Sequence, residues 1–221
     1  MLENINWLGH DSFRIEDSKQ GRYIYFDPFQ LASHEPKADL VLISHDHFDH
    51  YSPDDLYPLL KPTTVIVTVE SVAKLIAERK APQKVITVKP GDHVDALGYP
   101  IQAVPAYNTN KFRAPGQPFH PKSAGFVGFI ITVDGTRYYH TGDTDLIPEL
   151  SGIQTDVALI PVSGTYVMTP EEAIAAASQI KAKVLVPMHY GAIVGSETDA
   201  KQFADGVKQK GLDAQVLRKA T

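Results

Sequence analysis

The chain has no cysteine among its 221 residues. Disulfide bonds, zinc sites built from thiolates and cysteine nucleophiles are therefore all excluded. Because a chain without cysteine makes no use of an oxidising compartment, we expect a cytoplasmic protein.

Long apolar runs and an excess of basic residues are also missing. No stretch approaches the roughly 18 apolar residues of a transmembrane helix, and residues 1–8 lack the basic and apolar regions of a signal peptide. Lysine and arginine total 21 against 26 aspartate and glutamate, a net charge of −5. Since nucleic-acid binding depends on clustered cations, we expect neither a nucleic-acid nor a membrane partner. The length suits a single domain, residues 1–221.

Histidine, in contrast, is concentrated in one short stretch. Residues 44–50, Ser-His-Asp-His-Phe-Asp-His, hold three histidines and two aspartates. The apolar run at 40–43 before them has the length and branching of a buried strand, and Ser52 with Pro53 after them indicates a helix start. The stretch is therefore predicted to be a loop at the carboxyl end of a strand, where open α/β sheets bind ligands.

The spacing within this loop suits metal binding. His45 and His47 stand two residues apart and can converge from an extended or turning segment. Asp49 and His50 can reach a second point a few ångströms away. Imidazole with carboxylate suits Zn, Mn or Fe, and close pairs of such groups suit a two-metal centre. The alternative is a polar loop rich in histidine by chance, which five ligating residues within six positions disfavour.

The pattern His45-x-His47-x-Asp49-His50 after an apolar strand resembles the signature of the metallo-β-lactamase superfamily. That superfamily adds a histidine, an aspartate and a final histidine downstream, in that order. The segments Gly-Asp-Thr-Asp, Pro-Val-Ser-Gly-Thr-Tyr and Pro-Met-His-Tyr are similar to short bacterial and archaeal metal-dependent hydrolases related to L-ascorbate-6-phosphate lactonase. The similarity extends over nearly the whole chain.

The resemblance implies a fold, a ligand set and cofactors. The implied fold is α/β (α+β), a four-layer αββα sandwich of two mixed β-sheets with helices on both outer faces. Two divalent metal ions are implied, Zn or Mn first and Fe or Ni as further candidates. The implied ligands are His45, His47 and His120 for one metal, Asp49, His50 and His189 for the other, and Asp143 shared by both.

The rest of the chain shows the alternating pattern of an α/β protein. We predict strands at residues 5–8, 12–16, 23–26, 40–43, 64–68, 85–88, 101–107, 125–133, 136–140, 156–162 and 183–187, with an edge strand at 214–217. We predict helices at residues 54–60, 70–79, 169–180 and 197–210, the third with a capping box formed by Thr169 and Glu172.

Three further polar residues have two interpretations each. His10 is either a turn histidine bonded to backbone or a residue at the pocket rim that supports a metal ligand. Asp27 is either a turn former or a carboxylate that orients a ligand imidazole. His140 lies outside the ligand pattern and is predicted to support the site or to pack.

Residues 108–123 form a segment too long and irregular for a plain connection, and such loops usually carry function. We list His10, Asn108, Lys111, Tyr166 and Tyr190 as candidate substrate contacts. A solvated loop face is an equal alternative for Asn108 and Lys111.

The leading hypothesis is a metal-dependent hydrolase in which a metal-bound hydroxide attacks a small polar or anionic ester, lactone or phosphodiester. Asp49 is the predicted catalytic residue because it can orient the hydroxide or carry its proton. The alternatives are iron-dependent oxygen chemistry of the persulfide-dioxygenase kind, a nuclease or phosphodiesterase of the same fold, and a non-catalytic metal-binding module. The expected partner is a small molecule, and a homo-oligomer is left open.

Overall fold

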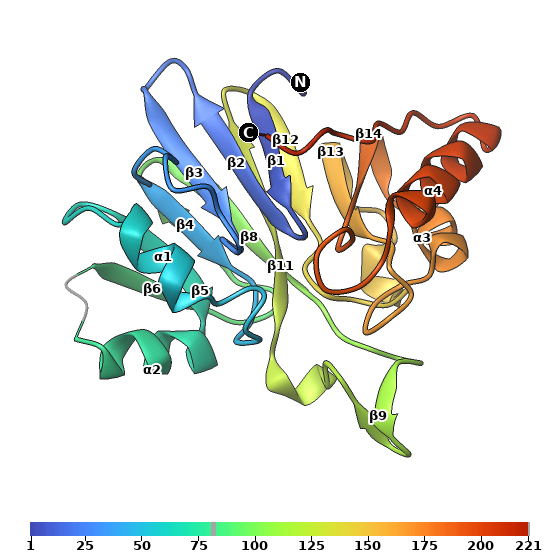
Figure 1. Cartoon of the computed structure of the whole chain (residues 1–221), viewed down its shortest axis with the longest axis horizontal. Coiled ribbons are helices and arrows are strands. Elements are labelled where there is room, and N and C mark those ends of the chain that lie inside the picture. The colour runs from blue at the N-terminus through green and yellow to red at the C-terminus, as the bar shows by residue number, and fades with distance from the viewer. Residues whose placement is uncertain (81–82, 221) are drawn as a thin grey trace.

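The computed structural model describes residues 1–80 and 83–220. Two six-stranded sheets pack against each other, and helices cover their outer faces (Figure 1). The order of layers is helix, sheet, sheet, helix. The predicted α/β sandwich of two mixed sheets is confirmed.

The first sheet comes from the amino-terminal part of the chain. Its strands are β1 Ile5–Gly9, β2 Ser12–Asp17, β3 Arg22–Phe26, β4 Leu40–Ile43, β5 Val65–Val69 and β6 Lys84–Val88, in this order across the sheet. The strands β1, β2 and β3 pair antiparallel, and β3 to β6 pair parallel. Every residue of β4 and β5 is buried, which explains why their sequences are continuous apolar runs.

The second sheet comes from the carboxyl-terminal part. Its strands are β7 His93–Ala96, β8 Tyr99–Pro105, β11 Val127–Val133, β12 Thr136–His140, β13 Gln154–Pro161 and β14 Lys181–Met188. The order across the sheet is β14-β13-β12-β11-β8-β7. Pairing is antiparallel from β7 to β12 and parallel from β12 to β14.

The helices are α1 Pro53–Leu59, α2 Glu70–Glu78, α3 Pro170–Ala177 and α4 Glu197–Gln209. α1 and α2 lie beside the first sheet, and α3 and α4 beside the second (Figure 1). The predicted capping box of α3 is confirmed, with hydrogen bonds of 2.8 and 3.3 Å between Thr169 and Glu172. Ser52 precedes α1 as predicted, but its hydroxyl donates to Asp55 Oδ2 at 2.6 Å and caps no backbone N–H.

The two sheets share one apolar core between them. Phe26 of β3 stacks on His140 of β12 with ring centroids 5.1 Å apart, and Phe13 of β2 contacts the edge of the same imidazole. All three side chains are fully buried. His140, the last residue of β12, therefore packs between the two sheets.

Two segments differ from the sequence prediction. The edge strand predicted at 214–217 is wrong: only Ala214 forms an isolated bridge with Leu185, because the backbone pairs with β14 through Asp213 and Gln215 alone. The irregular segment 108–123 contains a small hairpin, β9 Phe112–Ala114 with β10 Gln117–Pro118, which projects from the body of the fold (Figure 1). A short 3-10 helix, η1 Lys122–Ala124, follows it.

Among residues 1–80 and 83–220, no helix is both long enough and apolar enough to cross a membrane.

Candidate metal centre

Four of the predicted ligands lie in the loop between β4 and α1. Because β4 is buried, polar side chains can emerge only where the strand ends. The backbone N–H groups of His50 and Tyr51 both donate to the carbonyl of His47, at 3.0 and 2.8 Å. This tight turn separates Asp49 and His50 from His45 and His47, so the loop presents ligands at two points.

The other three predicted ligands come from the second sheet. Asp143 follows β12 and His189 follows β14, each just beyond the carboxyl end of its strand. His120 lies between β10 and β11, where its backbone N–H donates to Asn108 Oδ1 at 2.8 Å. The side chains of His120, Asp143 and His189 are all buried.

The first group of ligand atoms belongs to His45, His47 and His120. These atoms lie within 4.8 Å of one another, and His120 Nε2 is 3.1 Å from His47 Nδ1. Three imidazoles converging in this way are a typical ligand set for a transition metal.

Asp143 joins this group to a second one. Its Oδ2 lies 3.2 Å from Nε2 of both His120 and His189, and its Oδ1 lies 3.3 Å from His50 Nε2. A carboxylate in this position contacts histidines of both groups and could serve both of two neighbouring cations. The structure therefore brings all seven predicted ligands to one place.

The second nitrogen of four ligand imidazoles is held by a neighbouring group. These contacts are Ser44 Oγ with His45 Nδ1 at 2.9 Å, Asp27 Oδ2 with His50 Nδ1 at 2.8 Å, Asn108 Oδ1 with His120 Nδ1 at 2.9 Å, and Ser163 Oγ with His189 Nδ1 at 2.9 Å. Such partners fix the ring orientation and tautomer of metal-binding histidines. In each case Nε2 is left to face the centre.

These Nε2 atoms provide a test of whether a metal fits. Nε2 of His45, His50 and His189 and Oδ1 of Asp143 are buried, and they have no hydrogen-bond partner within the described ranges. Leaving buried polar atoms unpaired costs free energy, so such atoms need a partner. A divalent cation would satisfy all of them, and imidazole with carboxylate suits Zn, Mn or Fe. The side chains fit a metal centre.

Burial and neighbouring charges set the pKa values of these groups. Burial and the nearby His50 lower the pKa of His45 well below its usual value, which favours the neutral imidazole that binds metals. Burial opposes protonation of His189, but the carboxylates of Asp143 and Asp11 outweigh it and raise the pKa of His189 to about 9. A cation must displace a proton from His189 at neutral pH.

Asp49 lines the surface pocket, as His47, His120 and Asp143 do, but unlike them it is paired with His10. Its Oδ2 is 3.0 Å from His10 Nε2 and 3.7 Å from His50 Nε2. An ionised carboxylate can only accept hydrogen bonds. His10 Nε2 therefore carries the ring proton and donates the hydrogen bond to Asp49. Burial would raise the pKa of Asp49, but His50 and the hydrogen bond from His10 lower it to about 2.

The backbone is strained at three of these positions. His10, Asp27 and His189 have φ values of 53°, 40° and 60°, in the left-handed region that non-glycine residues rarely adopt. Strained residues of this kind cluster at functional sites, where the surrounding structure holds them in place. Here the N–H of His189 donates to the carbonyl of His10 at 3.2 Å, which locks two of the strained turns together.

Asp27 and His140 both support the centre without belonging to it. Asp27 accepts from the backbone N–H and hydroxyl of Ser44, at 2.8 and 2.6 Å, as well as contacting His50. Of its two predicted interpretations, the geometry matches the carboxylate that orients a ligand imidazole. His140 Nε2 donates to the carbonyl of Asp11 at 2.9 Å, and its Nδ1 accepts from the N–H of Gly142 at 3.2 Å.

The sequence analysis missed Asp11. It lies beside His10 in the turn between β1 and β2, is fully buried, and has oxygens near His10, His50 and His189. The available signal was a Gly-His-Asp turn between two apolar strands, in which a buried histidine and carboxylate adjoin. The signal is weak because such turns usually lie at the surface.

A pocket of about 440 Å³ opens onto the centre. Its floor contains His47, Asp49, His120 and Asp143, and Asp46 lies beside them. Its rim is made of the large apolar side chains Phe48, Phe119, Tyr166 and Ile193. Phe48 is 66% exposed, although it adjoins a metal-binding motif.

The predicted substrate contacts are distributed unevenly about this pocket. Tyr166 lines it, whereas the other four do not. Asn108 is buried and holds His120 and Asp145, and Lys111 pairs with Glu172 at 2.7 Å. Tyr190 is buried and stacks on Trp7 with centroids 4.7 Å apart, and His10 lies beneath Asp49.

Comparison with known proteins gives matches over most of the chain. A family model described as the beta-lactamase superfamily domain matches residues 4–189. A UPF0173 metal-dependent hydrolase of Archaeoglobus fulgidus is 30% identical over 96% of this chain and 94% of its own length. Another, of Methanoculleus marisnigri, is 34% identical over 90% of this chain and 86% of its own length.

Solved structures show the same extent of similarity. One crystal structure is of a Parabacteroides distasonis protein whose assignment as a metal-dependent hydrolase is itself inferred. Its sequence is 33% identical to this chain, and the structures superpose with a TM-score of 0.82. The match covers 98% of this chain and 93% of that one. CmlA, a diiron beta-hydroxylase of Streptomyces venezuelae, is 14% identical with a TM-score of 0.74 over 97% of this chain and 52% of its own. This second likeness shows the fold alone.

Proposed function

The chain belongs to the metallo-β-lactamase superfamily, and from this premise we propose that it is a metal-dependent hydrolase with two neighbouring divalent cations. The one observation that carries the proposal is Asp143. Its Oδ1 faces His50 and its Oδ2 faces both His120 and His189, at 3.2–3.3 Å, so this one carboxylate contacts imidazoles of both predicted ligand sets. A shared carboxylate between two sets of imidazoles is the arrangement that a pair of cations requires.

His45, His47 and His120 would hold one cation and His50 and His189 the other, with Asp143 available to both. Asp49, which the family resemblance adds to the second set, is assigned to the attacking water instead. When bound, the cations supply Lewis acidity, which acidifies water and polarises the oxygen of the bond to be cleaved. Zn and Mn are the first candidates for this donor set, with Fe or Ni next.

Asp49 is the residue of this chain best placed to act on the attacking water. It lies on the pocket floor, and the hydrogen bond from His10 fixes its orientation. Its low pKa, about 2, keeps it ionised at neutral pH. An ionised carboxylate accepts a hydrogen bond from water and aims a lone pair of the water oxygen at the substrate.

The pocket supports a narrower substrate class than the sequence analysis suggested. Among the residues that the structure describes, no lysine or arginine lines it. A centre with two divalent cations would carry little net positive charge, because Asp11, Asp46, Asp49 and Asp143 would offset them. The apolar rim favours a neutral ester or lactone that carries an aromatic or aliphatic group over a phosphodiester. The expected substrate is therefore a small molecule with one apolar substituent.

The test combines metal analysis with a substrate panel. Protein loaded with Zn, Mn or Fe is assayed on aryl and alkyl esters, lactones and phosphodiesters, and His45→Ala is compared with His93→Ala, a matched change at an exposed histidine of β7. We expect His45→Ala to lose turnover and metal together, while His93→Ala keeps both. Full hydrolytic activity in His45→Ala would refute the proposal.

Two further arms address the substrate and the alternative chemistry. Phe48→Ala should raise KM for aryl esters more than for acetyl esters of the same leaving group, and preferential turnover of phosphodiesters would contradict the apolar substrate class. Oxygen uptake by the iron-loaded protein without hydrolysis of any panel member would favour oxygen chemistry instead. The cytoplasmic location stays a prediction.

A further inference from the structure

Asp11 is the most deeply buried carboxylate at the centre. Its relative exposure is 0%, it does not line the pocket, and neither of its oxygens has a hydrogen-bond partner within residues 1–80 and 83–220. An isolated carboxylate with no partner is among the most costly groups to bury. To stay ionised it needs positive charge close by, and among the residues that the structure describes no lysine or arginine forms an ion pair with it.

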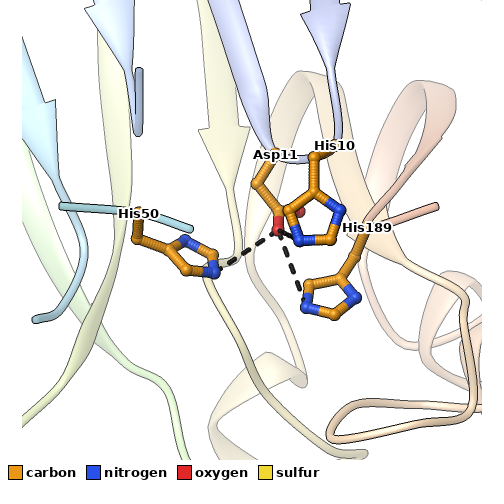
Figure 2. A group of neighbouring side chains, drawn as sticks. All are labelled: His10, Asp11, His50 and His189. Atoms are coloured by element: carbon orange, nitrogen blue, oxygen red, sulfur yellow. Dashed lines mark ion pairs between the residues drawn. The ribbon is translucent and has the colours of Figure 1, made fainter. Parts of the chain in front are cut away.

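Three imidazoles surround this carboxylate (Figure 2). Asp11 Oδ2 lies 3.5 Å from His50 Nε2, 3.6 Å from His10 Nε2 and 3.8 Å from His189 Nε2. Nε2 of His50 and Nε2 of His189 both face Asp11. Neither atom has a hydrogen-bond partner among the described residues. Their opposite nitrogens are held by Asp27 and Ser163, so these rings cannot turn away.

These separations, 3.5–3.8 Å, lie at or just above the spacing of ligands around a metal. Ligand atoms about 2.0–2.2 Å from a tetrahedral cation lie roughly 3.3–3.6 Å from one another. Direct hydrogen bonds between such atoms would be about 2.7–3.0 Å long. The group is thus too open for side chains that bond one another, and it has the size of a coordination shell.

We propose that Asp11 is a metal ligand, completing with His50, His189 and Asp143 the site of the second cation. The inference rests on the proposed metal centre and adds a carboxylate that the family pattern of His45 to His189 does not contain. With Asp11 present this site is richer in carboxylate than the site formed by His45, His47 and His120. It therefore prefers a harder cation such as Mn or Fe, while the three-histidine site suits Zn.

Asp11 also changes the part played by Asp49. Asp11 is fully buried, whereas Asp49 lines the pocket and can therefore face water and substrate. His10 Nε2 donates to Asp49 at 3.0 Å and lies 3.6 Å from Asp11, so it separates the two carboxylates. Asp11 binds metal and Asp49 orients water.

The first test measures cation affinity in Asp11→Asn, which keeps the shape of the side chain and removes its charge. Losing a partner that only orients a ligand lowers metal affinity by about 10–100-fold, so losing a ligand should lower it by more than about 100-fold for one cation of the two. The control is Asp17→Asn, a buried carboxylate at the other end of the same hairpin, which should bind both cations as wild type does. Wild-type affinity for both cations in folded Asp11→Asn would overturn the proposal.

The second test needs no variant. A crystal structure of the manganese-loaded wild-type protein, with the cations located by anomalous scattering, should place Asp11 Oδ2 about 2.0–2.2 Å from one cation. A separation above 3 Å would overturn the proposal even if both cations are present. Hydrolysis of the substrate panel is scored separately in the wild type, so loss of the Asp11 assignment and loss of the hydrolase assignment are distinguishable outcomes.

Discussion

At the scale of single residues, the centre depends on side chains that hold the ligands in place. Asp27 is the clearest case, since one carboxylate contacts His50 Nδ1 and both the N–H and hydroxyl of Ser44. It thereby fixes the imidazole ring of His50. It also fixes Ser44, where the loop that carries His45 and His47 begins.

Asp27→Asn should lower metal affinity by about 10–100-fold, because an NH2 group that cannot accept replaces one of the two oxygens that accept from His50 and Ser44. Competition of the protein with a chelating indicator measures this change. The matched control is Asp39→Asn, a carboxylate just before β4 that pairs with Lys61 and lies outside the centre. Equal affinity in the Asp27 and Asp39 variants would contradict the assigned role.

The raised pKa of His189, about 9, gives a second prediction at this scale. Below pH 9 the ring carries a proton that the cation must displace, so metal affinity should increase by up to about tenfold per pH unit between pH 6 and pH 9. Isothermal titration in buffers of different ionisation enthalpy measures the proton released. Cation binding at pH 7 without proton release would contradict a raised pKa of His189.

The sequence predicted seven candidate ligands from their spacing and the family resemblance, and the structure brings these side chains to one place. The sequence could not predict which polar residues hold them. Asn108 was predicted to contact substrate or to lie on a solvated loop face, whereas it is buried and hydrogen-bonds His120, and Asp11 was not predicted as a site residue. Both roles depend on how the two sheets meet, which local sequence does not encode.

At the scale of elements, the loop after β12 depends on a glycine. Gly142 has a φ of +63°, and a Cβ added there would lie 2.7 Å from the carbonyl oxygen of Val127 in β11. The backbone thus turns sharply and passes close to the neighbouring strand, and this places Asp143 at the centre.

Gly142→Ala should therefore destabilise the protein by more than the roughly 1–3 kcal/mol that a left-handed conformation alone costs. Gly135→Ala isolates that conformational cost, since Gly135 has a φ of +81° and open space where a Cβ would go. Denaturant unfolding of both variants gives the comparison. A loss of stability no larger in Gly142→Ala than in Gly135→Ala would show that the close approach is unimportant.

Elements with strong hydrophobic patterns were predicted well. The strand at 40–43 is found at Leu40–Ile43, because a continuous apolar run is the pattern of a strand buried in a parallel sheet. The segment 214–217, Ala-Gln-Val-Leu, is also mostly apolar, but too few of its backbone groups reach β14 to form a ladder. Whether such an edge segment forms a strand depends on its pairing with a strand far away in the sequence, here β14.

At the scale of the whole molecule, the two sheets are also joined by a buried hydrogen bond. The hydroxyl of Tyr99 in β8 donates to Asp17 at the end of β2. Burial alone would raise the pKa of Asp17, but the hydrogen bonds from Tyr99 and from the backbone N–H groups of Gln20 and Lys19 lower it overall. The ionised carboxylate is therefore the form that stabilises the fold.

Because the folded pKa of Asp17 is lowered, its contribution is present above the unfolded pKa of about 3.9 and is lost as the pH falls through the folded value. Asp17→Asn should be less stable than wild type at pH 7, and the difference should shrink below about pH 4. Thermal unfolding across this range tests it. A difference that grows as the pH falls would contradict the assignment.

The most direct test of the whole account is the number of divalent cations bound per chain. Elemental analysis of protein equilibrated with Zn or Mn and freed of excess cation should give two per chain in the wild type and fewer in His45→Ala. A folded wild-type chain that retains no cation under these conditions would contradict the metal centre and the chemistry derived from it.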